Sequence, residues 1–210
     1  MSRYRLAIFD ADGTLFDSLR GIYASIRHTI GEMGLRDLSD EEMRLHIGPP
    51  VDEAYRRSFG ISGEMLEETV RCHRKFNTEH GVEMSSVFPG IANMLDTLKS
   101  RGIFTAVASL KPSETLARMI GIHGLAFDSI HGYSGTETKG DLIRMCMSDL
   151  GCAPGETVMV GDTVNDEAGA ESAGIDFIPV SYGYGFGRGG DTADSPEQVL
   201  ERIIGAKSDG

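Results

Sequence analysis

The 210-residue sequence contains no tryptophan, only three cysteines and fewer basic than acidic residues. Cys72, Cys146 and Cys152 form no Cys-x-x-Cys pair, and an odd count without a secretion signal indicates reduced thiols rather than a disulfide framework. No apolar run approaches the roughly 18 residues that a membrane-spanning helix requires. The first apolar run follows the N-terminus without the pattern of a signal peptide, so we expect a cytoplasmic protein that does not use a membrane as a partner.

The shortage of basic residues gives a net charge of −12. Nucleic acid backbones are bound by basic surfaces, so this charge argues against nucleic acid as a partner. It does not exclude a small phosphorylated metabolite, because one metal ion and one or two lysines neutralise such a ligand locally. The sequence carries no pattern that indicates an oligomeric state.

Strand patterns and helix patterns alternate along most of the chain. After Pro89, helical patterns at 91–100, 113–120, 139–150, 164–173 and 196–203 alternate with strand patterns at 103–108, 127–130, 157–160 and 177–180. This alternation predicts an α/β fold, with a doubly wound parallel sheet and helices on both of its faces. The apolar run at 4–9 belongs to the same sheet by its composition.

A purely helical segment interrupts this pattern after the first strand. Apolar residues recur at helical spacing between residue 17 and about residue 81, and Ser39 with Glu42 forms a candidate capping box. We therefore predict an α/β core domain over 1–16 and 84–210, with an inserted all-helical cap domain over 17–83. The insertion follows the carboxyl end of a strand, where open α/β sheets bind ligands, so it is placed to act as a lid.

Acidic residues stand at the ends of two strand patterns. One strand leads into Asp10 and Asp12, and a later one leads into Asp162, with Asp166 about one helical turn further on. Magnesium prefers oxygen ligands and is commonly held by one or two carboxylates plus a substrate phosphate. These two junctions predict one Mg²⁺ site. An EF-hand calcium loop is excluded because its later acidic positions are not acidic here.

Each group that phosphoryl transfer needs has a candidate in this sequence. Asp10 is a candidate nucleophile that forms an aspartyl phosphate, and Asp12 is a candidate general acid and base. Ser109 ends a strand pattern, so its hydroxyl is placed to hold phosphoryl oxygens. Lys139 begins a helix and Lys111 follows Ser109, so either lysine is a candidate for offsetting the phosphoryl charge.

Glycine alternates with aromatic residues in the stretch 183–190, directly after a strand pattern. A dinucleotide fingerprint requires a helix to begin at that point, whereas a polar stretch with Asp191 and Asp194 follows here. We interpret the stretch as a mobile loop.

Four motifs taken in order resemble those of the haloacid dehalogenase (HAD) superfamily of phosphohydrolases. They are the run Asp10–Thr14, Ser109 after a strand, Lys139, and the run Gly161–Asp166. The resemblance covers the whole chain and implies a HAD-type Rossmannoid core. It also implies that Asp10 is the nucleophile and a magnesium ligand, and that Asp12 is the acid/base and lends its backbone carbonyl to the metal. Asp162 and Asp166 would complete the metal site.

The same resemblance extends to the phosphoryl-binding and substrate-binding residues. It implies that Ser109 binds the phosphoryl group and that Lys139 stabilises its charge. The helical insertion resembles a C1-type cap, and the stretches around Gly48, Arg74 and Pro89 are similar to the phosphoglycolate phosphatase-like branch. Gly48 and Arg74, together with Lys111 as a cation just after Ser109, are our candidate substrate-binding residues.

The expected function is hydrolysis of a small phosphorylated metabolite by a magnesium-dependent phosphatase. The alternatives are a sugar-phosphate mutase or a 5′-nucleotidase of the same superfamily. A phosphonate-cleaving member would require a cap lysine, for which Lys75 is the candidate. A non-enzymatic phosphoacceptor switch is a further alternative, although such receivers place the aspartate on a later strand and carry no helical cap.

Overall fold

A parallel β-sheet forms the centre of the protein, whose computed structural model describes residues 3–205. Among these residues the strand order is β5-β4-β1-β6-β7. The strands are β1 (Leu6–Phe9), β4 (Phe104–Pro112), β5 (Ser129–Tyr133), β6 (Thr157–Gly161) and β7 (Asp176–Pro179). Because β1 pairs in parallel with both β4 and β6, the residues that follow these three strands meet at one edge of the sheet.

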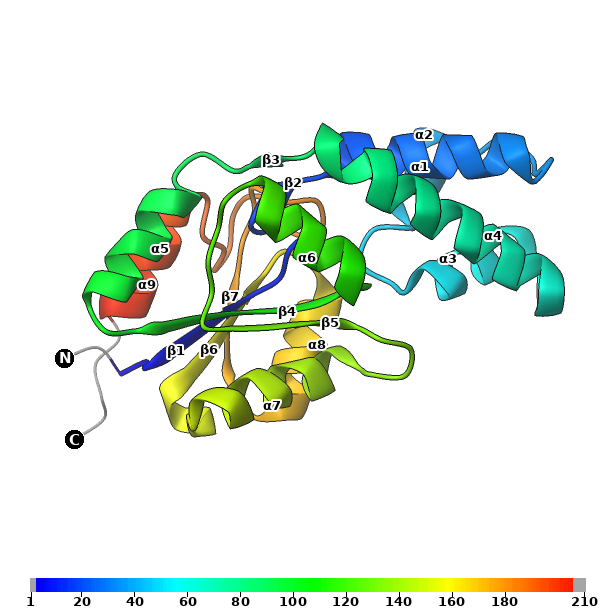
Figure 1. The fold of residues 1–210 in the computed structure, drawn as a ribbon. Coiled ribbons are helices and arrows are strands. Elements are labelled where there is room, and N and C mark those ends of the chain that lie inside the picture. The colour runs from blue at the N-terminus through cyan, green and yellow to red at the C-terminus, as the bar shows by residue number, and fades with distance from the viewer. Residues whose placement is uncertain (1–2, 206–210) are drawn as a thin grey trace.

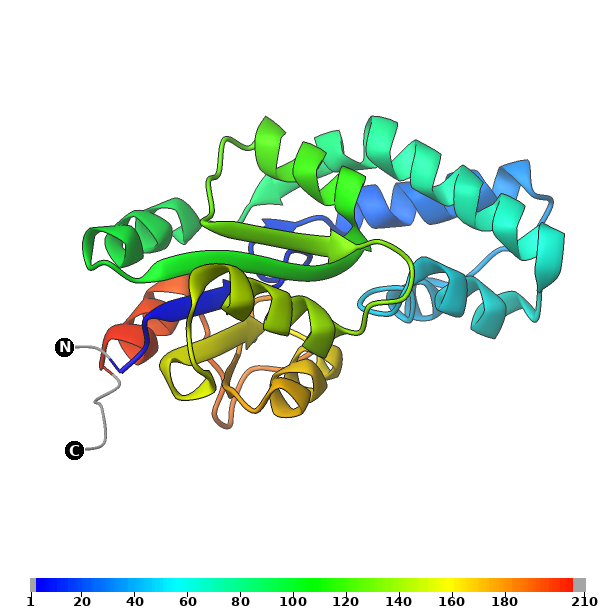
Figure 2. The same ribbon diagram turned by 60° about the horizontal axis from the view of Figure 1, so that its bottom comes forward.

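Helices cover both faces of this sheet, as Figures 1 and 2 show. Alternate β1 side chains point to opposite faces: Leu6 and Ile8 belong to one core cluster, and Ala7 and Phe9 to the other. The first cluster is covered by α7 (Lys139–Leu150) and α8 (Val164–Ala173). The second is covered by α5 (Ile91–Ser100), α6 (Ser113–Ile122) and α9 (Pro196–Gly205). The predicted doubly wound fold class is confirmed.

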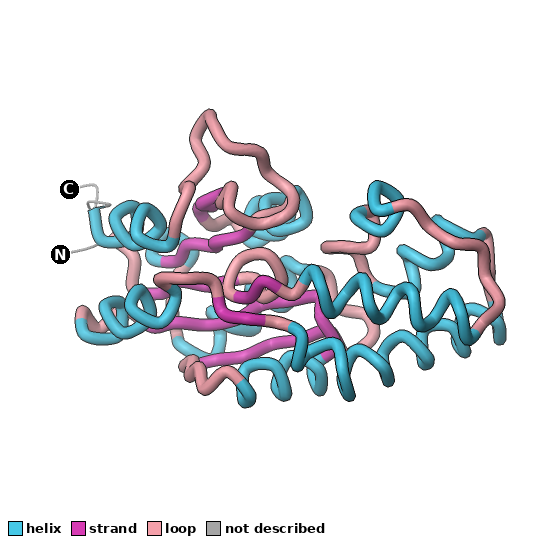
Figure 3. The backbone as a smooth tube through the Cα atoms, turned by 90° about the horizontal axis from the view of Figure 1, so that it is seen from above, coloured by secondary structure: helices cyan, strands magenta, loops and turns pink. Residues whose placement is uncertain are grey.

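A helical segment lies beyond the sheet, at the end of the molecule opposite the two chain termini (Figures 1 and 3). Its elements are α1 (Leu19–Glu32), α2 (Asp40–Arg44), α3 (Val51–Phe59), α4 (Gly63–Phe76), the π-helical turn η1 (Asn77–Gly81) and the 3₁₀ turn η2 (Val82–Met84). Ser39 and Glu42 form the predicted capping box of α2. The segment has apolar clusters of its own, one around Ile26 and Met43 and one around Tyr55.

Two short strands join the helical segment to the sheet. The strands β2 (Phe16–Asp17) and β3 (Ser86–Val87) pair in antiparallel fashion, next to the start of α1 and the end of η2. This ribbon was not predicted from the sequence, because two-residue strands are too short to show a period. None of the helices within 3–205 combines the length and the apolar character of a membrane span.

One sheet strand is longer than the sequence indicated. β4 continues past Ala108 as far as Pro112, with an irregularity in its pairing to β5 between Ser109 and Pro112. Polar and proline residues at this end gave no strand pattern. The consequence is that Ser109 and Lys111 project from the end of a sheet strand.

Candidate active site

Three buried carboxylates converge at the carboxyl ends of β1 and β6. Asp10 follows β1, Asp162 follows β6, and Asp166 lies in the first turn of α8. One carboxylate oxygen from each lies within 4.8 Å of the other two. The structure thus brings together three of the four predicted metal ligands through their side chains.

The turn after β1 brings the backbone against Asp162. Gly13 has φ +83°, a left-handed conformation, and a Cβ built on it would lie 2.3 Å from Asp162 Oδ2. Within the same turn, the Thr14 hydroxyl donates to Asp162 Oδ1 over 3.2 Å. Glycine therefore serves two needs here, namely the backbone conformation and the close approach to a carboxylate.

Lys139 is the cation of this cluster. It is the first residue of α7, a helix capped by Thr138 and Asp141. Its ammonium nitrogen lies 2.6 Å from Asp10 Oδ1 and 2.7 Å from Asp166 Oδ1, and it also donates to the Ala108 carbonyl over 3.0 Å. The helix start thus directs the lysine at the candidate nucleophile.

Asp166 is held in place by the start of its own helix. Its Oδ2 accepts hydrogen bonds from the Thr163 backbone N–H over 3.0 Å and from the Thr163 hydroxyl over 2.7 Å. This capping arrangement leaves Oδ1 facing Lys139 and the other two carboxylates.

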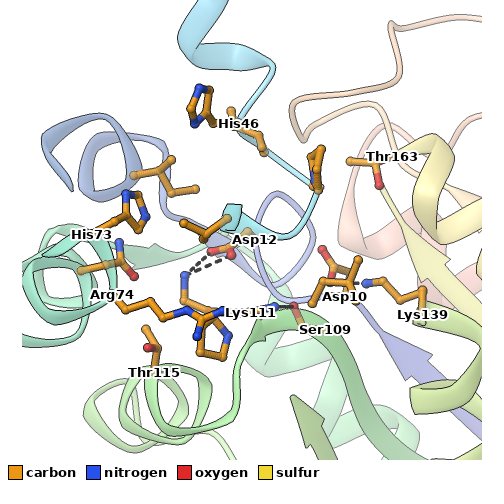
Figure 4. Close-up of a pocket in the computed structure, with 18 of the residues that line it drawn as sticks. Asp10, Asp12, His46, His73, Arg74, Ser109, Lys111, Thr115, Lys139 and Thr163 are labelled. Carbon is orange, nitrogen blue, oxygen red and sulfur yellow. Dashed lines mark hydrogen bonds and ion pairs between the residues drawn. The ribbon is translucent and has the colours of Figure 1, made fainter. Parts of the chain in front are cut away.

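Asp12 and Lys111 form a second ion pair in the same pocket, drawn with dashed lines in Figure 4. The Lys111 ammonium donates to both Asp12 oxygens, over 3.0 and 3.1 Å. Ser109 lies between the two ion pairs; its hydroxyl accepts the Lys111 backbone N–H over 3.3 Å. Both candidate lysines therefore reach the site, Lys139 on Asp10 and Lys111 on Asp12.

The helical segment closes the pocket from the other side. Residues from it that line the pocket include His46, Gly48, His73, Arg74 and Asn77. His73 is buried beside the Tyr55 hydroxyl at 3.0 Å, and burial, followed by the nearby charges of His46, Lys111 and Arg74, lowers the pKa of His73 to about 3. The imidazole is thus neutral at physiological pH.

Arg74 is the cation that the helical segment contributes to the pocket. Its Nε is buried and has no hydrogen-bond partner within the described residues. The three predicted substrate-binding residues, Gly48, Arg74 and Lys111, thus line the same pocket as Asp10.

Burial and neighbouring charges shift the pKa values of the ionisable groups in the site. Burial raises the pKa of Asp10 against the opposing charge of Lys139, and the charges of Asp166 and Asp12 raise it further. Burial, followed by the charge of Asp10, raises the pKa of Asp162 to about 7. Burial alone would lower the pKa of Lys139, but the charges of Asp10 and Asp166 outweigh it, so the pKa is raised and the lysine stays cationic.

The donor set fits a divalent metal ion of the magnesium type. Three carboxylates facing one ammonium leave two uncompensated negative charges when all of them are ionised, and their oxygens are the hard ligands that Mg²⁺ prefers. Burial and, after it, the crowding of these carboxylates raise the pKa values of Asp10 and Asp162, and a bound cation would oppose both shifts.

The glycine-rich stretch 183–190, which was interpreted from the sequence as a mobile loop, also contacts the site. The Tyr184 backbone N–H donates to Asp162 Oδ2 over 2.7 Å. A Cβ on Gly183 would lie 2.3 Å from the Gly13 carbonyl oxygen, and one on Gly185 would lie 2.3 Å from the Asp162 carbonyl oxygen. The alternating glycines after the strand pattern were the available signal for this close approach.

Known proteins resemble the chain over most of its length. A family model described as haloacid dehalogenase-like hydrolase matches residues 7–180. The tyrosine-protein kinase PtkA of Mycobacterium tuberculosis is 37% identical over 187 residues, covering 86% of this chain and 63% of PtkA. This chain thus spans less than two thirds of that relative. A Pseudomonas aeruginosa 5′-nucleotidase is 34% identical over 190 residues, covering 87% of this chain and 85% of the nucleotidase.

Two further matches bear on the branch and on the fold. A phosphoglycolate phosphatase from Vibrio parahaemolyticus is 27% identical over 212 residues, covering 95% of this chain and 92% of the phosphatase. The structure of a haloacid dehalogenase-like family hydrolase from Streptococcus pneumoniae superposes with a TM-score of 0.87 at 26% identity, covering 96% and 99% of the two chains. The resemblance inferred from the motifs is confirmed. The chain belongs to the haloacid dehalogenase-like hydrolase family.

Proposed function

We propose that this protein is a magnesium-dependent phosphatase that hydrolyses a small phosphorylated metabolite of the phosphoglycolate type through an aspartyl phosphate. The observation that carries this proposal is the convergence of Asp10, Asp162 and Asp166 around Lys139, at the floor of a pocket that the helical segment covers. Bound Mg²⁺ would be held by these three carboxylates and by the Asp12 carbonyl, and would supply positive charge for the transferring phosphoryl group.

Asp10 and Asp12 divide the chemistry between them. An Asp10 oxygen attacks phosphorus, the bond from phosphorus to the ester oxygen breaks, and the leaving oxygen takes a proton from Asp12. Water then gives a proton to the Asp12 carboxylate while its oxygen attacks phosphorus. This second step breaks the bond to Asp10 and releases inorganic phosphate. Ser109 and Lys139 hold the phosphoryl oxygens in both steps.

The part of the substrate that is not transferred faces the helical segment, which we assign as the cap domain over 17–83. Arg74 gives this side of the pocket a positive charge, and its buried Nε has no partner in the described residues. Lys111 and Gly48 also line this side, although the Lys111 ammonium is paired with Asp12. The guanidinium of Arg74 favours a substrate with an acidic group near its phosphate, and this supports the phosphoglycolate type. Lys75 lines a different pocket, together with Glu79 and Glu114. The position of Lys75 therefore does not support a phosphonate-cleaving activity.

Three other functions would use the same acidic and basic groups. A sugar-phosphate mutase would return the phosphoryl group to its substrate rather than to water, so steady phosphate release distinguishes the phosphatase from it. The similarity to the Pseudomonas aeruginosa enzyme supports a 5′-nucleotidase as an alternative. The non-enzymatic switch differs in the lifetime of its phosphoaspartate, which a chase with unlabelled substrate measures.

Phosphate release from a panel of phosphorylated metabolites with Mg²⁺ tests the proposal. The panel includes phosphoglycolate, sugar phosphates and 5′-nucleotides, and compares the wild-type protein with Asp10→Asn and Asp96→Asn. Asp96 is an exposed residue of α5, so its variant controls for the loss of an acidic group. We expect Asp10→Asn to lower kcat by at least about 10³-fold and Asp96→Asn to leave it unchanged. Near-wild-type turnover by Asp10→Asn would refute the proposed nucleophile.

A further inference from the structure

The loop after β7 contacts Asp162, one of the three carboxylates of the proposed metal site, and its glycines make this contact sterically feasible. The Phe186 N–H donates to the Asp162 carbonyl over 3.0 Å, and the Tyr184 N–H donates to Asp162 Oδ2 over 2.7 Å. Side chains at Gly183 or Gly185 would collide with the backbone of Gly13 or of Asp162. The backbone of Tyr184 is thus fixed against Asp162.

The side chain of Tyr184 extends away from Asp162, to residues 17–19, where the chain passes from the core into the cap. Its hydroxyl accepts the N–H of Ser18 over 2.7 Å and the N–H of Leu19 over 3.1 Å, and it donates to Asp17 Oδ1 over 2.8 Å. These contacts use the one donor and both acceptor sites of the hydroxyl group. Burial, followed by the bond to Asp17, raises the pKa of Tyr184, which keeps the hydroxyl protonated.

The start of α1 depends on this hydroxyl. Ser18 occupies the N-cap position, but its side chain makes no capping bond, and its Oγ is buried without a partner in the described part of the chain. Tyr184 therefore accepts the N–H of the N-cap residue and that of the first helical residue, and the Leu19 N–H is one of the donors at a helix start that have no partner within the helix. Asp17 belongs to β2, one of the two strands that link α1–η2 to the sheet.

We propose that Tyr184 is a positioning residue that couples the cap to the metal site, so that divalent cation binding and the resting cap position stabilise each other. The residue holds Asp162 through its backbone and the first turn of the cap through its hydroxyl. A cation that fixes the Asp162 carboxylate therefore also fixes the anchor of α1, and by linkage the anchored cap strengthens cation binding. The inference rests on the metal site of the proposed function.

Tyr184→Phe and Tyr182→Phe form a matched pair of variants for the test. Tyr184→Phe removes the hydroxyl contacts at the start of α1 but keeps the backbone bond to Asp162. Tyr182 lies in the same loop, and its hydroxyl donates to the Thr14 carbonyl of the core rather than to the cap. Tyr184→Phe loses the hydroxyl hydrogen bonds to Asp17, Ser18 and Leu19, and Tyr182→Phe loses the one to Thr14, so loosening of this loop in general affects both variants.

The measurements are Mg²⁺ affinity by calorimetry and hydrogen exchange of the Ser18 and Leu19 amides by NMR, with and without Mg²⁺. In the wild-type protein and in Tyr182→Phe, we expect Mg²⁺ to slow exchange of these amides about fivefold or more. In Tyr184→Phe, we expect exchange that does not respond to Mg²⁺ and an affinity for Mg²⁺ lower by a similar factor.

The possible results separate this inference from the proposed function. Equal Mg²⁺ affinity and equal Mg²⁺-dependent protection in Tyr184→Phe and in the wild type would refute the coupling, while the phosphatase proposal would stand. A wild-type protein that binds no Mg²⁺ would contradict both. A Tyr182→Phe variant that also loses the Mg²⁺ response would overturn the specific role of the Tyr184 hydroxyl.

Discussion

The ammonium group of Lys139 lies 2.6 Å from Asp10 Oδ1, although the two residues are 129 positions apart in the sequence. Both side chains are almost completely buried, at 6% and 10% exposure. A buried ion pair of this kind contributes little to stability compared with apolar residues of similar volume, whereas removing one partner leaves an uncompensated charge. The pair is therefore better explained by the proposed chemistry, in which the lysine offsets negative charge beside the attacked phosphorus.

We expect Lys139→Met to lower kcat for phosphate release at least about 10²-fold, because the phosphoryl charge would no longer be offset. Lys139→Arg keeps the charge but cannot fit the contacts with Asp10, Asp166 and Ala108, so it should recover only part of the activity. Steady-state kinetics measures both variants. Lys111→Met is the matched comparison, and a greater loss of kcat there would assign the charge-stabilising role to Lys111.

Arg74 should determine the KM for substrates that carry an acidic group. Its buried Nε without a partner and its place in the pocket predict a charged hydrogen bond to such a group. We expect Arg74→Gln to raise KM about 10- to 100-fold for phosphoglycolate and to leave KM for an uncharged alkyl phosphate unchanged. The exposed Arg71, one turn earlier on α4, provides the control variant Arg71→Gln. Equal effects of Arg74→Gln on both substrates would contradict this assignment.

Much of the site was predictable because parallel strands end at a common edge. The alternation of strands and helices predicted a parallel sheet without its strand order, and the observed pairing of β1 with β4 and β6 brings together Asp10, Ser109 and Asp162. Helix-start patterns likewise indicated Lys139 and Asp166, because a residue in the first turn after a strand returns to the same edge. These predictions required only local periodicity and chain order.

Other parts of the site depend on tertiary contacts without a local pattern. Lys111 was a rival to Lys139, and its pairing with Asp12 arises because β4 continues through polar residues that showed no strand period. The loop of Tyr184 carried a glycine signal, but its path across Asp162 depends on where β7 ends relative to β6. The β2–β3 ribbon was missed because its strands have two residues each.

A side chain at Gly13 should destabilise the protein through backbone strain and through a clash with Asp162. Comparison with Gly34 separates these two effects. Gly13 and Gly34 both have positive φ, +83° and +62°, but only Gly13 has a neighbour, Asp162 Oδ2, within reach of a Cβ. We expect Gly34→Ala to lower the free energy of unfolding by about 1 kcal/mol. Gly13→Ala should lower it further and reduce the stabilisation that Mg²⁺ gives. Urea unfolding with and without Mg²⁺ measures both effects, and identical losses in the two variants would contradict the proposed clash.

The raised pKa of Asp162 predicts how the stability of the metal-free protein depends on pH. The folded carboxyl titrates at about 7 instead of 3.8, because burial and the charge of Asp10 oppose its ionisation. Between these two values the folded state binds more protons than the unfolded state, so this group lowers stability as pH rises. His46 and His73 have lowered pKa values, to about 4 and about 3 because of burial, and they contribute with the opposite sign below pH 6.5. The comparison must therefore be made with a variant that lacks only the carboxyl.

Asp162→Asn is that variant, since the asparagine side chain keeps the size of the carboxyl and does not titrate. From pH 5 to pH 8, in the presence of a chelator, we expect the wild-type protein to lose on the order of 3 kcal/mol more unfolding free energy than Asp162→Asn. Added Mg²⁺ should restore the stability of the wild type at pH 8, where the carboxylates are ionised, and should have little effect on the variant. Urea unfolding at each pH gives these values. Parallel pH dependences in the two proteins would mean that Asp162 ionises as freely in the folded state as in the unfolded chain, and that crowding of charge does not prepare this site for a cation.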